Sequence, residues 1–307
     1  MGKLRCRVCG HGEAKSLGQI PDCAEFAGQL VSPPIKGGEL WLCKDCGSMF
    51  RHPTLSASEY ISLYEKAPST VWVEGEVERN DLVTIYAYLN NHAGGLILDV
   101  GCYTGDFLAG LPDKFKKYGI EPSNLASESA ASKGIDVLGK TLDELDSDKV
   151  FNVVVLIDVI EHVLDVEKLL SQALARVKEN GLLIISTGNP GCFFWKKVFK
   201  SVYWYNVFAE HVTFPSYNYY IEFARRHGLQ TPEQIRFRYT KLKYMVRLST
   251  LFRNVLFTFS PAVYQILRKI RKITTNSTAT DALVAPASLI GAFADHHVIV
   301  FRKKGLR

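Results

Sequence analysis

The chain has 307 residues, of which 47% are hydrophobic and 22% are charged, and its formal net charge is +6. This length suffices for about two domains with a sizeable core, and the composition is ordinary for a globular protein. The first residues are polar and basic, and no apolar run is long enough to cross a bilayer, which excludes a secretion signal and a membrane span. We therefore expect a cytoplasmic protein.

Two Cys-x-x-Cys pairs near the N-terminus predict a metal site. Cys6 and Cys9 form the first pair, Cys43 and Cys46 form the second, and a glycine follows each. Four thiolates complete the tetrahedral coordination of Zn²⁺ and leave no open position, so we expect a structural zinc ion rather than a catalytic one. Residues 1–55 are therefore predicted to form a small zinc-ribbon-like module, rich in loops.

The next elements are two predicted helices, over 56–65 and 76–89, and then an apolar run typical of a buried parallel strand. This strand ends at Asp99, and Gly101 and Gly105 follow it in a loop that also contains Cys102. The spacing differs from the Gly-x-Gly-x-x-Gly of dinucleotide-binding loops. A carboxylate at this position would repel phosphates and suits a cationic ligand with an amino acid end.

A helix is predicted over 107–117 and a short second strand over 118–121, which ends at Glu121. Glu121 lies 22 residues after Asp99, close to the spacing of about 20 residues at which an acid meets ribose hydroxyls. A carboxylate can accept hydrogen bonds from two neighbouring hydroxyls. We therefore interpret Glu121 as a ribose-binding residue.

Strands are next predicted over 135–138, 150–157 and 182–186. The second of them ends at Asp158, and Asp165 caps a following helix whose apolar face extends to Val177 and which Gly181 ends. This alternation of strands and helices is typical of a doubly wound α/β fold with a mostly parallel sheet.

The loop over 97–105 resembles the first motif of class I S-adenosylmethionine-dependent methyltransferases, with Tyr103 in place of the middle glycine. Segments 119–123, 158–163 and 179–184 resemble successive signatures of one group, which includes ubiquinone-biosynthesis and many sugar methyltransferases. The resemblance covers roughly residues 75–230.

The resemblance implies a Rossmann-like methyltransferase domain over 56–235 and a seven-stranded sheet, which strands over 231–240 and 296–302 would complete. It implies that S-adenosylmethionine is the cofactor. The residues expected to bind this cofactor are Asp99, Gly101, Cys102, Gly105, Glu121 and, beside its methionine end, Asp158.

Glu210 and His211 are the candidate catalytic pair, directly before a helix predicted over 217–227 and capped by Ser216. A histidine can remove the acceptor proton near neutral pH, while a carboxylate fixes its tautomer or orients the substrate. The pair resembles a Tyr-His-Glu-His stretch of sugar methyltransferases with similar cysteine knuckles. Because the tyrosine, the first histidine and a further C-terminal domain are missing, we expect O-methylation of a sugar, nucleotide-linked or glycan- or lipid-linked, rather than carbon methylation.

Residues 236–272 are rich in large apolar and basic side chains, and from Gln234 to Thr280 the chain has ten Lys and Arg residues and no Asp or Glu. One interpretation of residues 236–307 is a cap over the active site plus the last strand of the sheet. The other is a segment that lies on the anionic inner face of a membrane.

Two further functions fit the sequence. Zinc-knuckle modules precede similar domains in some RNA methyltransferases, although only Asn189-Pro190 represents the Asn-Pro-Pro-Tyr-like motif of base methylation, so a nucleic acid partner is disfavoured. A non-catalytic binding protein with the same fold is the other alternative.

Overall fold

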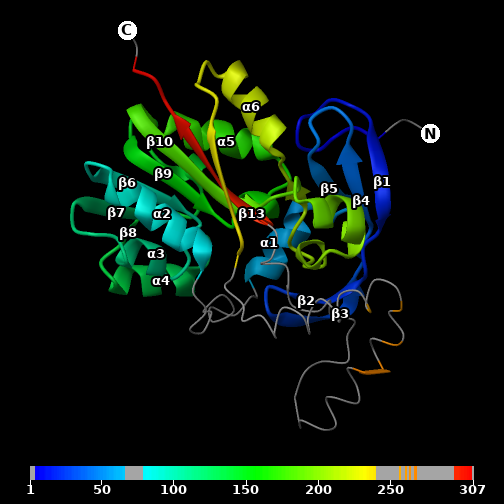
Figure 1. Cartoon of the computed structure of the whole chain (residues 1–307). Coiled ribbons are helices and arrows are strands. Elements are labelled where there is room, and N and C mark those ends of the chain that lie inside the picture. The colour runs from blue at the N-terminus through cyan, green and yellow to red at the C-terminus, as the bar shows by residue number, and fades with distance from the viewer. Residues whose placement is uncertain are drawn as a thin grey trace.

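The computed structural model describes residues 4–65, 79–239 and 294–305, together with five single residues between 256 and 267. Two sheets lie side by side, a large one built from the middle and end of the chain and a smaller one built mainly from its start (Figure 1). Most of the predicted cap or membrane-surface segment, 240–272, lies outside the described residues. No helix among the described residues is long and apolar enough to cross a membrane.

The large sheet has seven strands in the order β12-β13-β10-β9-β6-β7-β8. The strands are β6 Gly95–Val100, β7 Phe115–Ile120, β8 Asp136–Val137, β9 Phe151–Ile157, β10 Val177–Gly188, β12 Glu233–Phe237 and β13 His296–Arg302. All run parallel except β13, which is antiparallel to both β10 and β12. The predicted mostly parallel, seven-stranded sheet is therefore confirmed.

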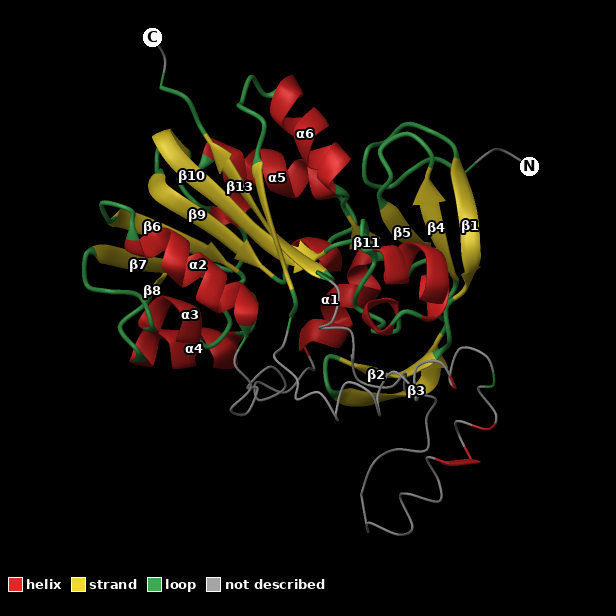
Figure 2. Cartoon of the chain, viewed as in Figure 1, coloured by secondary structure: helices red, strands yellow, loops and turns green. Residues whose placement is uncertain are grey.

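Helices cover both faces of this sheet (Figure 2). The helices are α2 Asn80–Asn90, α3 Asp106–Ala109, α4 Asn124–Ser132, α5 Val166–Ala175 and α6 Tyr217–Arg226. Because side chains alternate along a strand, Ile97 and Val153 pack with α2, α3 and α4, while Leu98 and Val154 pack with α5 and α6. Asp165 and Ser216 cap α5 and α6 as predicted, by accepting bonds from the backbone N–H of Lys168 and Tyr219.

Two predicted helices are shorter than the sequence pattern indicates. The helix predicted over 107–117 is the single turn α3, because Gly110 and Pro112 interrupt it and β7 already begins at Phe115. The helix predicted to end at Gly181 ends at Ala175, and Val177 pairs with Phe151 as the first residue of β10. Val177 is β-branched and fits a buried strand as well as it fits a helix face.

The small sheet has the order β1-β4-β5-β11 and joins distant parts of the chain. The elements near the N-terminus are β1 Ala14–Gln19, β2 Cys23–Phe26, β3 Gln29–Ile35, β4 Glu39–Cys43, β5 Met49–His52 and α1 Ala57–Glu65. Strand β11, Thr213–Phe214, comes from the C-terminal half and pairs with β5. The cysteine-rich module and the large domain are therefore connected by a shared sheet.

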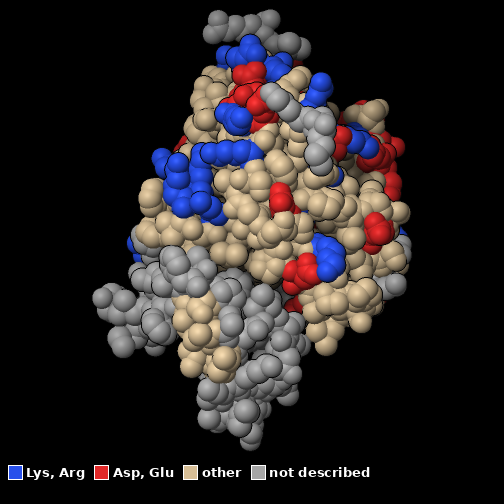
Figure 3. All heavy atoms as spheres, turned by 90° about the vertical axis from the view of Figure 1, so that its right-hand side faces the viewer, with Lys and Arg blue, Asp and Glu red and all other residues tan. Residues whose placement is uncertain are grey.

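Short helical turns surround this junction. They are η2 Ile160–His162, η3 Phe194–Phe199, η4 Lys200–Val202 and η5 Trp204–Asn206. A further turn, η1 Leu142–Glu144, lies against α5. Trp195 of η3 packs with Leu40 and Met49 of the module and with Phe214 of β11. On the module side of the molecule, the described charged side chains lie in several groups within a larger uncharged area, and in some groups basic and acidic side chains touch (Figure 3).

Candidate active site

The loops that carry the predicted cofactor-binding residues meet at one edge of the large sheet. Asp99 and Val100 pair in parallel register with Gly119 and Ile120, so Glu121 follows β7 where Gly101 follows β6. Gly101 has φ +79°, and a Cβ at this position would meet a methyl group of Val159 at 2.8 Å. A side chain would therefore clash here, and the backbone stays bare where a ligand can approach closely.

Glu121 ties the two loops together. One of its carboxylate oxygens accepts a hydrogen bond from the backbone N–H of Tyr103 at 2.8 Å, and the other accepts one from Ser123 at 2.8 Å. Burial raises the pKa of this carboxyl group. Since each carboxylate oxygen can accept a second bond, Glu121 can still bind two neighbouring hydroxyls.

Asp99 is 3% exposed, and its Oδ1 atom is buried without a hydrogen-bond partner among the described residues. Burial and the nearby Glu121 raise the pKa of Asp99 to about 8. A buried acceptor without a donor is unfavourable unless a ligand supplies one. The bare Gly101 backbone, the Glu121 carboxylate and this orphaned oxygen fit S-adenosylmethionine, which offers ribose hydroxyls and an amino group.

Cys102 and Gly105 differ in what they offer a ligand. The Cys102 side chain is buried against Gly119, where a Cβ would meet its sulfur at 2.4 Å, so it packs in the core. Gly105 begins α3 with φ +78° and lies close to Ala130 and Ile135. Tyr103 has φ +48°, in the left-handed region that glycine adopts more easily. This conformation explains why related motifs have a glycine at that position.

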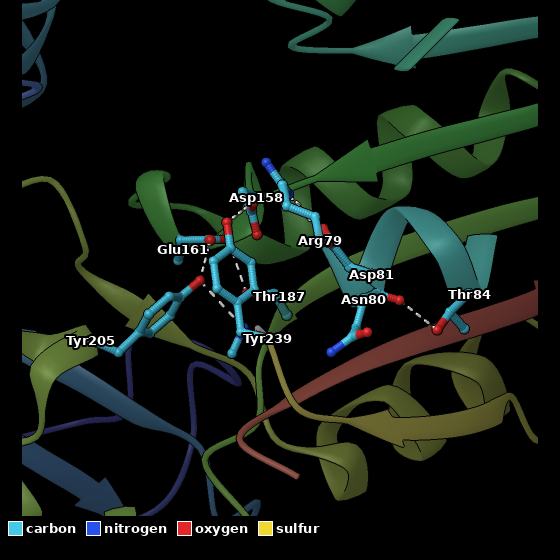
Figure 4. A network of polar contacts seen from close by, with 10 residues as sticks. Arg79, Asn80, Asp81, Thr84, Asp158, Glu161, Thr187, Tyr205 and Tyr239 are labelled. Carbon is cyan, nitrogen blue, oxygen red and sulfur yellow. Dashed lines mark hydrogen bonds and ion pairs between the residues drawn. The ribbon is translucent and has the colours of Figure 1, made fainter. Parts of the chain in front are cut away.

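Asp158 lies at the centre of a polar network (Figure 4). Arg79, which precedes α2, donates to both oxygens of Asp81 at 3.1 and 2.5 Å and to Oδ2 of Asp158 at 2.5 Å. Tyr239, which follows β12, donates its hydroxyl to the same Asp158 oxygen at 3.4 Å. Two segments far apart in the sequence therefore converge on the residue that follows β9.

Asp158 itself is held in an unusual state. Its φ is +52°, and its Oδ1 atom is buried without a hydrogen-bond partner in the part of the chain that the structure describes. Burial raises the pKa of Asp158 more than the ion pair with Arg79 lowers it. Backbone strain and an unsatisfied carboxylate oxygen together are typical of a ligand-binding position.

His211 lies next to this network. Its Nδ1 lies 2.7 Å from the backbone carbonyl of Tyr205, which can only accept, so the proton resides on Nδ1 and the lone pair on Nε2. Burial and the neighbouring His162 hold the pKa of His211 well below its ordinary value. The imidazole is therefore neutral at physiological pH, with a nitrogen available to accept a proton. Glu210, in contrast, is 2% exposed, and burial raises its pKa.

Glu161 and His162 line the same region. The Tyr205 hydroxyl and the Thr187 hydroxyl both donate to the Glu161 carboxylate, and the Tyr64 hydroxyl lies 3.0 Å from Nδ1 of His162. Glu161, His162 and His211 offer ligand atoms that all lie within 4.8 Å of one another, so they are a second group that could hold a metal ion.

The four cysteines of the module come together as predicted. Cys6 and Cys46 have their sulfurs 3.9 Å apart, as do Cys9 and Cys43, and all four sulfurs lie within 4.8 Å of one another. Backbone N–H groups of Val8 and Cys9 point at the Cys6 sulfur at 3.3 and 3.5 Å. This geometry fits an ion bound at about 2.3 Å from each sulfur. Gly10 and Gly47, at φ +72° and +74°, make the turns after each pair.

Arg51 of β5 connects this module to the candidate catalytic pair. Its guanidinium is 1% exposed and donates to the backbone carbonyls of Asn206 and Phe208 at 2.5 and 2.8 Å. Its backbone N–H donates to the carbonyl of Val212 at 2.9 Å. Arg51 therefore holds the segment on both sides of Glu210 and His211.

Three residues of this site were not predicted from the sequence: Arg79, Tyr205 and Tyr239. All three lie outside the recognisable motifs, and only the folded chain brings them to Asp158 and Glu161. Arg79 lies in the first turn of the helix predicted over 76–89, and nothing in that pattern distinguishes it as a site residue.

Residues 78–234, about half of the chain, match the family model described as a methyltransferase domain. A ubiquinone biosynthesis O-methyltransferase of Rickettsia akari is 37% identical over 115 residues, which are 34% of this chain and 45% of the relative. The enzyme of the same name from Bradyrhizobium diazoefficiens is 36% identical over 116 residues, 34% of this chain and 44% of the relative. The chain thus spans less than half the length of these curated relatives.

Solved structures show the same fold. Phosphoethanolamine N-methyltransferase 2 of Haemonchus contortus, in complex with S-adenosyl-L-methionine, superposes with a TM-score of 0.51 at 14% identity. The superposition covers 99% of this chain and 71% of that one. At this identity the likeness concerns the fold alone.

Proposed function

The chain belongs to the class I S-adenosylmethionine-dependent methyltransferases, and from that premise we propose that it methylates a hydroxyl oxygen of a sugar. The observation that carries the O-methylation is the neutral, buried side chain of His211. Its Nδ1 bonds to the backbone carbonyl of Tyr205, which leaves the lone pair on Nε2. A hydroxyl acceptor needs such a base, because its proton must leave as the new bond forms.

S-adenosylmethionine, when bound, supplies an electrophilic methyl group: an electron pair of the acceptor oxygen forms the O–C bond, and the S–C pair stays on sulfur. The acceptor proton goes to a histidine nitrogen, so charge balances when the base becomes an imidazolium. Glu121 would hold the ribose, and Asp99 and Asp158 would receive the donors at the amino acid end of the cofactor. Arg79, paired with Asp158 at 2.5 Å, is suited to bind its carboxylate.

The sugar acceptor rests on the resemblance to sugar methyltransferases with N-terminal cysteine knuckles. A nucleotide-linked sugar and a lipid-linked glycan are both compatible with it; the second would need residues 236–272 at the inner face of a membrane. Arg51 supports a role for the module in catalysis, since it holds the Glu210–His211 segment through two carbonyls.

A phenolic hydroxyl is the second candidate acceptor. It is favoured by the relatives named ubiquinone biosynthesis O-methyltransferase and by the aromatic side chains of Trp204, Tyr205 and Tyr239 around the site. An RNA acceptor has less support, because the described charges on the module face form separate groups rather than a basic stripe (Figure 3).

The test is a methyl-transfer assay with isotopically labelled S-adenosylmethionine and three probes: dTDP-glucose, UDP-glucose and catechol. We expect label in an O-methyl ether of a sugar probe. The His211→Gln variant should lower turnover about 10²- to 10⁴-fold while its affinity for S-adenosylmethionine stays near wild type. If only catechol becomes labelled, the acceptor is a phenol and not a sugar. If S-adenosylmethionine binds but its methyl group is transferred to none of the hydroxyl probes, O-methylation is contradicted.

A further inference from the structure

A second buried histidine, His296, packs against the same tyrosine as His211. It is the first residue of β13 and lies opposite Gly188 of β10 and Phe237 of β12. The ring centroid of Tyr205 lies 5.0 Å from that of His296 and 4.2 Å from that of His211. The hydroxyl of Tyr205 bonds to Glu161, so both histidines adjoin the polar network of the site.

His296 forms a buried pair with the preceding Asp295. Nδ1 of His296 lies 3.3 Å from Oδ1 of Asp295, and both side chains are at most 1% exposed. Asp295 is itself fixed, because it accepts bonds from the Tyr239 backbone N–H at 3.2 Å and the Tyr203 hydroxyl at 3.3 Å. A carboxylate at Nδ1 orients an imidazole and stabilises its protonated form.

Both ring nitrogens of His296 are buried, and neither makes a hydrogen bond within the described ranges. Nδ1 makes the ion-pair contact with Asp295, whereas Nε2 has no polar contact of this kind with any described residue. The ring stacks on Tyr239 at 4.4 Å and on Trp204 at 5.9 Å, and Tyr239 also bonds to Asp158. A buried, unpartnered imidazole nitrogen among aromatic rings beside Asp158 is suited to meet an acceptor hydroxyl.

The electrostatic surroundings of the two histidines are opposite. His211 has a backbone carbonyl at Nδ1, and His162, Arg51 and His296 disfavour its charged form. For His296, burial lowers the pKa, but the nearby carboxylates of Asp295, Asp158 and Asp81 raise it by more than burial lowers it. The net shift of the His296 pKa is therefore upward. Several titratable groups surround His296. They are the neighbouring Asp295 and His297, together with Asp81, Asp158, Glu161, His211, Tyr203, Tyr205 and Tyr239.

We propose a base other than the His211 assigned above: the Asp295–His296 pair accepts the proton of the acceptor hydroxyl, and His211 orients the acceptor. This inference rests on the proposed O-methylation and refines its base. The O–H bond breaks toward Nε2 of His296, the oxygen keeps its electron pair for the new O–C bond, and Asp295 balances the imidazolium that forms.

The first experiment needs no acceptor. The full chain, labelled with ¹³C-histidine, is titrated by NMR with and without S-adenosylmethionine, and the His296 resonance is assigned by its loss in His296→Gln. We expect His296 to titrate above an ordinary histidine and to shift downward in Asp295→Asn. A His296 resonance that titrates below an ordinary histidine in the wild type would overturn the proposal.

The second experiment follows kcat against pH with the probe that the wild type methylates. Because the base must be deprotonated, wild-type kcat should rise with pH through the His296 titration. His296→Gln should lower the plateau about 10²- to 10⁴-fold and abolish that rise, whereas His211→Gln should keep the rise. His297→Gln, which replaces the next buried histidine of β13, is the matched control and should leave the profile unchanged.

The outcomes separate the two proposals. If the wild type methylates a hydroxyl and His296→Gln keeps both plateau and pH profile, the assignment of the base is wrong and O-methylation stands. If no hydroxyl probe is methylated although S-adenosylmethionine binds, the proposed function fails. The unfolding temperature and the S-adenosylmethionine affinity of each variant are both expected near wild type. A variant in which they change has lost activity through misfolding.

Discussion

The carboxyl group of Asp99 is buried at the end of β6 with one oxygen unpartnered among the residues described. Such a group destabilises the unliganded protein whenever it is charged, because its desolvation is not compensated. The same oxygen favours binding once a ligand donor meets it. Asp99 therefore links stability, pH and ligand binding in one residue.

Replacing Asp99 by Asn should stabilise the unliganded protein at high pH. The folded pKa of about 8 exceeds the unfolded value near 3.8, so the folded state holds the extra proton and stability falls as pH rises between these values. In Asp99→Asn this fall should disappear, with a gain of about 1–3 kcal/mol at pH 9 and little change at pH 4. Urea unfolding across this pH range measures it, and equal pH dependence in both proteins would contradict it.

The sequence predicted some of these residues better than others. Asp99, Glu121 and Asp158 could be predicted because each ends a buried strand, and the carboxyl ends of parallel strands meet at one sheet edge. Arg79 and Tyr239 could not, since their contacts with Asp158 depend on how remote segments fold together. His296 was predicted only as the first residue of a strand and Asp295 was not singled out, because nothing local shows that β13 begins beside Tyr205.

Strands β5 and β11 explain how a cysteine-rich module can influence a distant site. Their pairing places Thr213, which follows His211 by two residues, opposite Phe50. Arg51 of β5 adds bonds to the carbonyls of Asn206 and Phe208. The sequence predicted the metal-ligand cluster from its spacing, but a two-residue strand such as β11 carries no periodicity that could predict the pairing.

We propose that the four cysteines bind one structural Zn²⁺, and the purified chain should therefore contain one zinc ion by elemental analysis. Cys46→Ser should lose this zinc and lower the unfolding temperature, because a structural zinc contributes directly to folding free energy. Turnover should fall more than S-adenosylmethionine affinity does, since Arg51 holds the Glu210–His211 segment and not the cofactor loops. Cys23→Ser, a free cysteine outside the cluster, is the control and should keep the metal; zinc retained in Cys46→Ser would contradict the assignment.

The whole molecule combines a doubly wound seven-stranded sheet with a four-stranded sheet, and the C-terminal half of the chain contributes β11 to the four-stranded sheet. The mostly parallel, doubly wound architecture of the large sheet followed from alternating strand and helix patterns, and its seven strands followed from the family resemblance. The bounds of two elements did not follow from the pattern. The helix predicted over 107–117 ends before Gly110 and Pro112, and β10 begins early because Val177 fits either a helix face or a buried strand. Local pattern thus indicated the architecture, while tertiary packing decided the element ends.

Calorimetric titration of the full chain with S-adenosylmethionine tests the central claim most directly. The geometry of Asp99, Gly101 and Glu121 predicts one binding site per chain and, in Glu121→Gln, an affinity reduced about tenfold or more, because the ribose hydroxyls lose a charged acceptor. Glu144→Gln, an exposed glutamate of η1, should bind as the wild type does. An unchanged affinity in Glu121→Gln, or a wild type that binds a pyrophosphate dinucleotide in place of S-adenosylmethionine, would contradict the account.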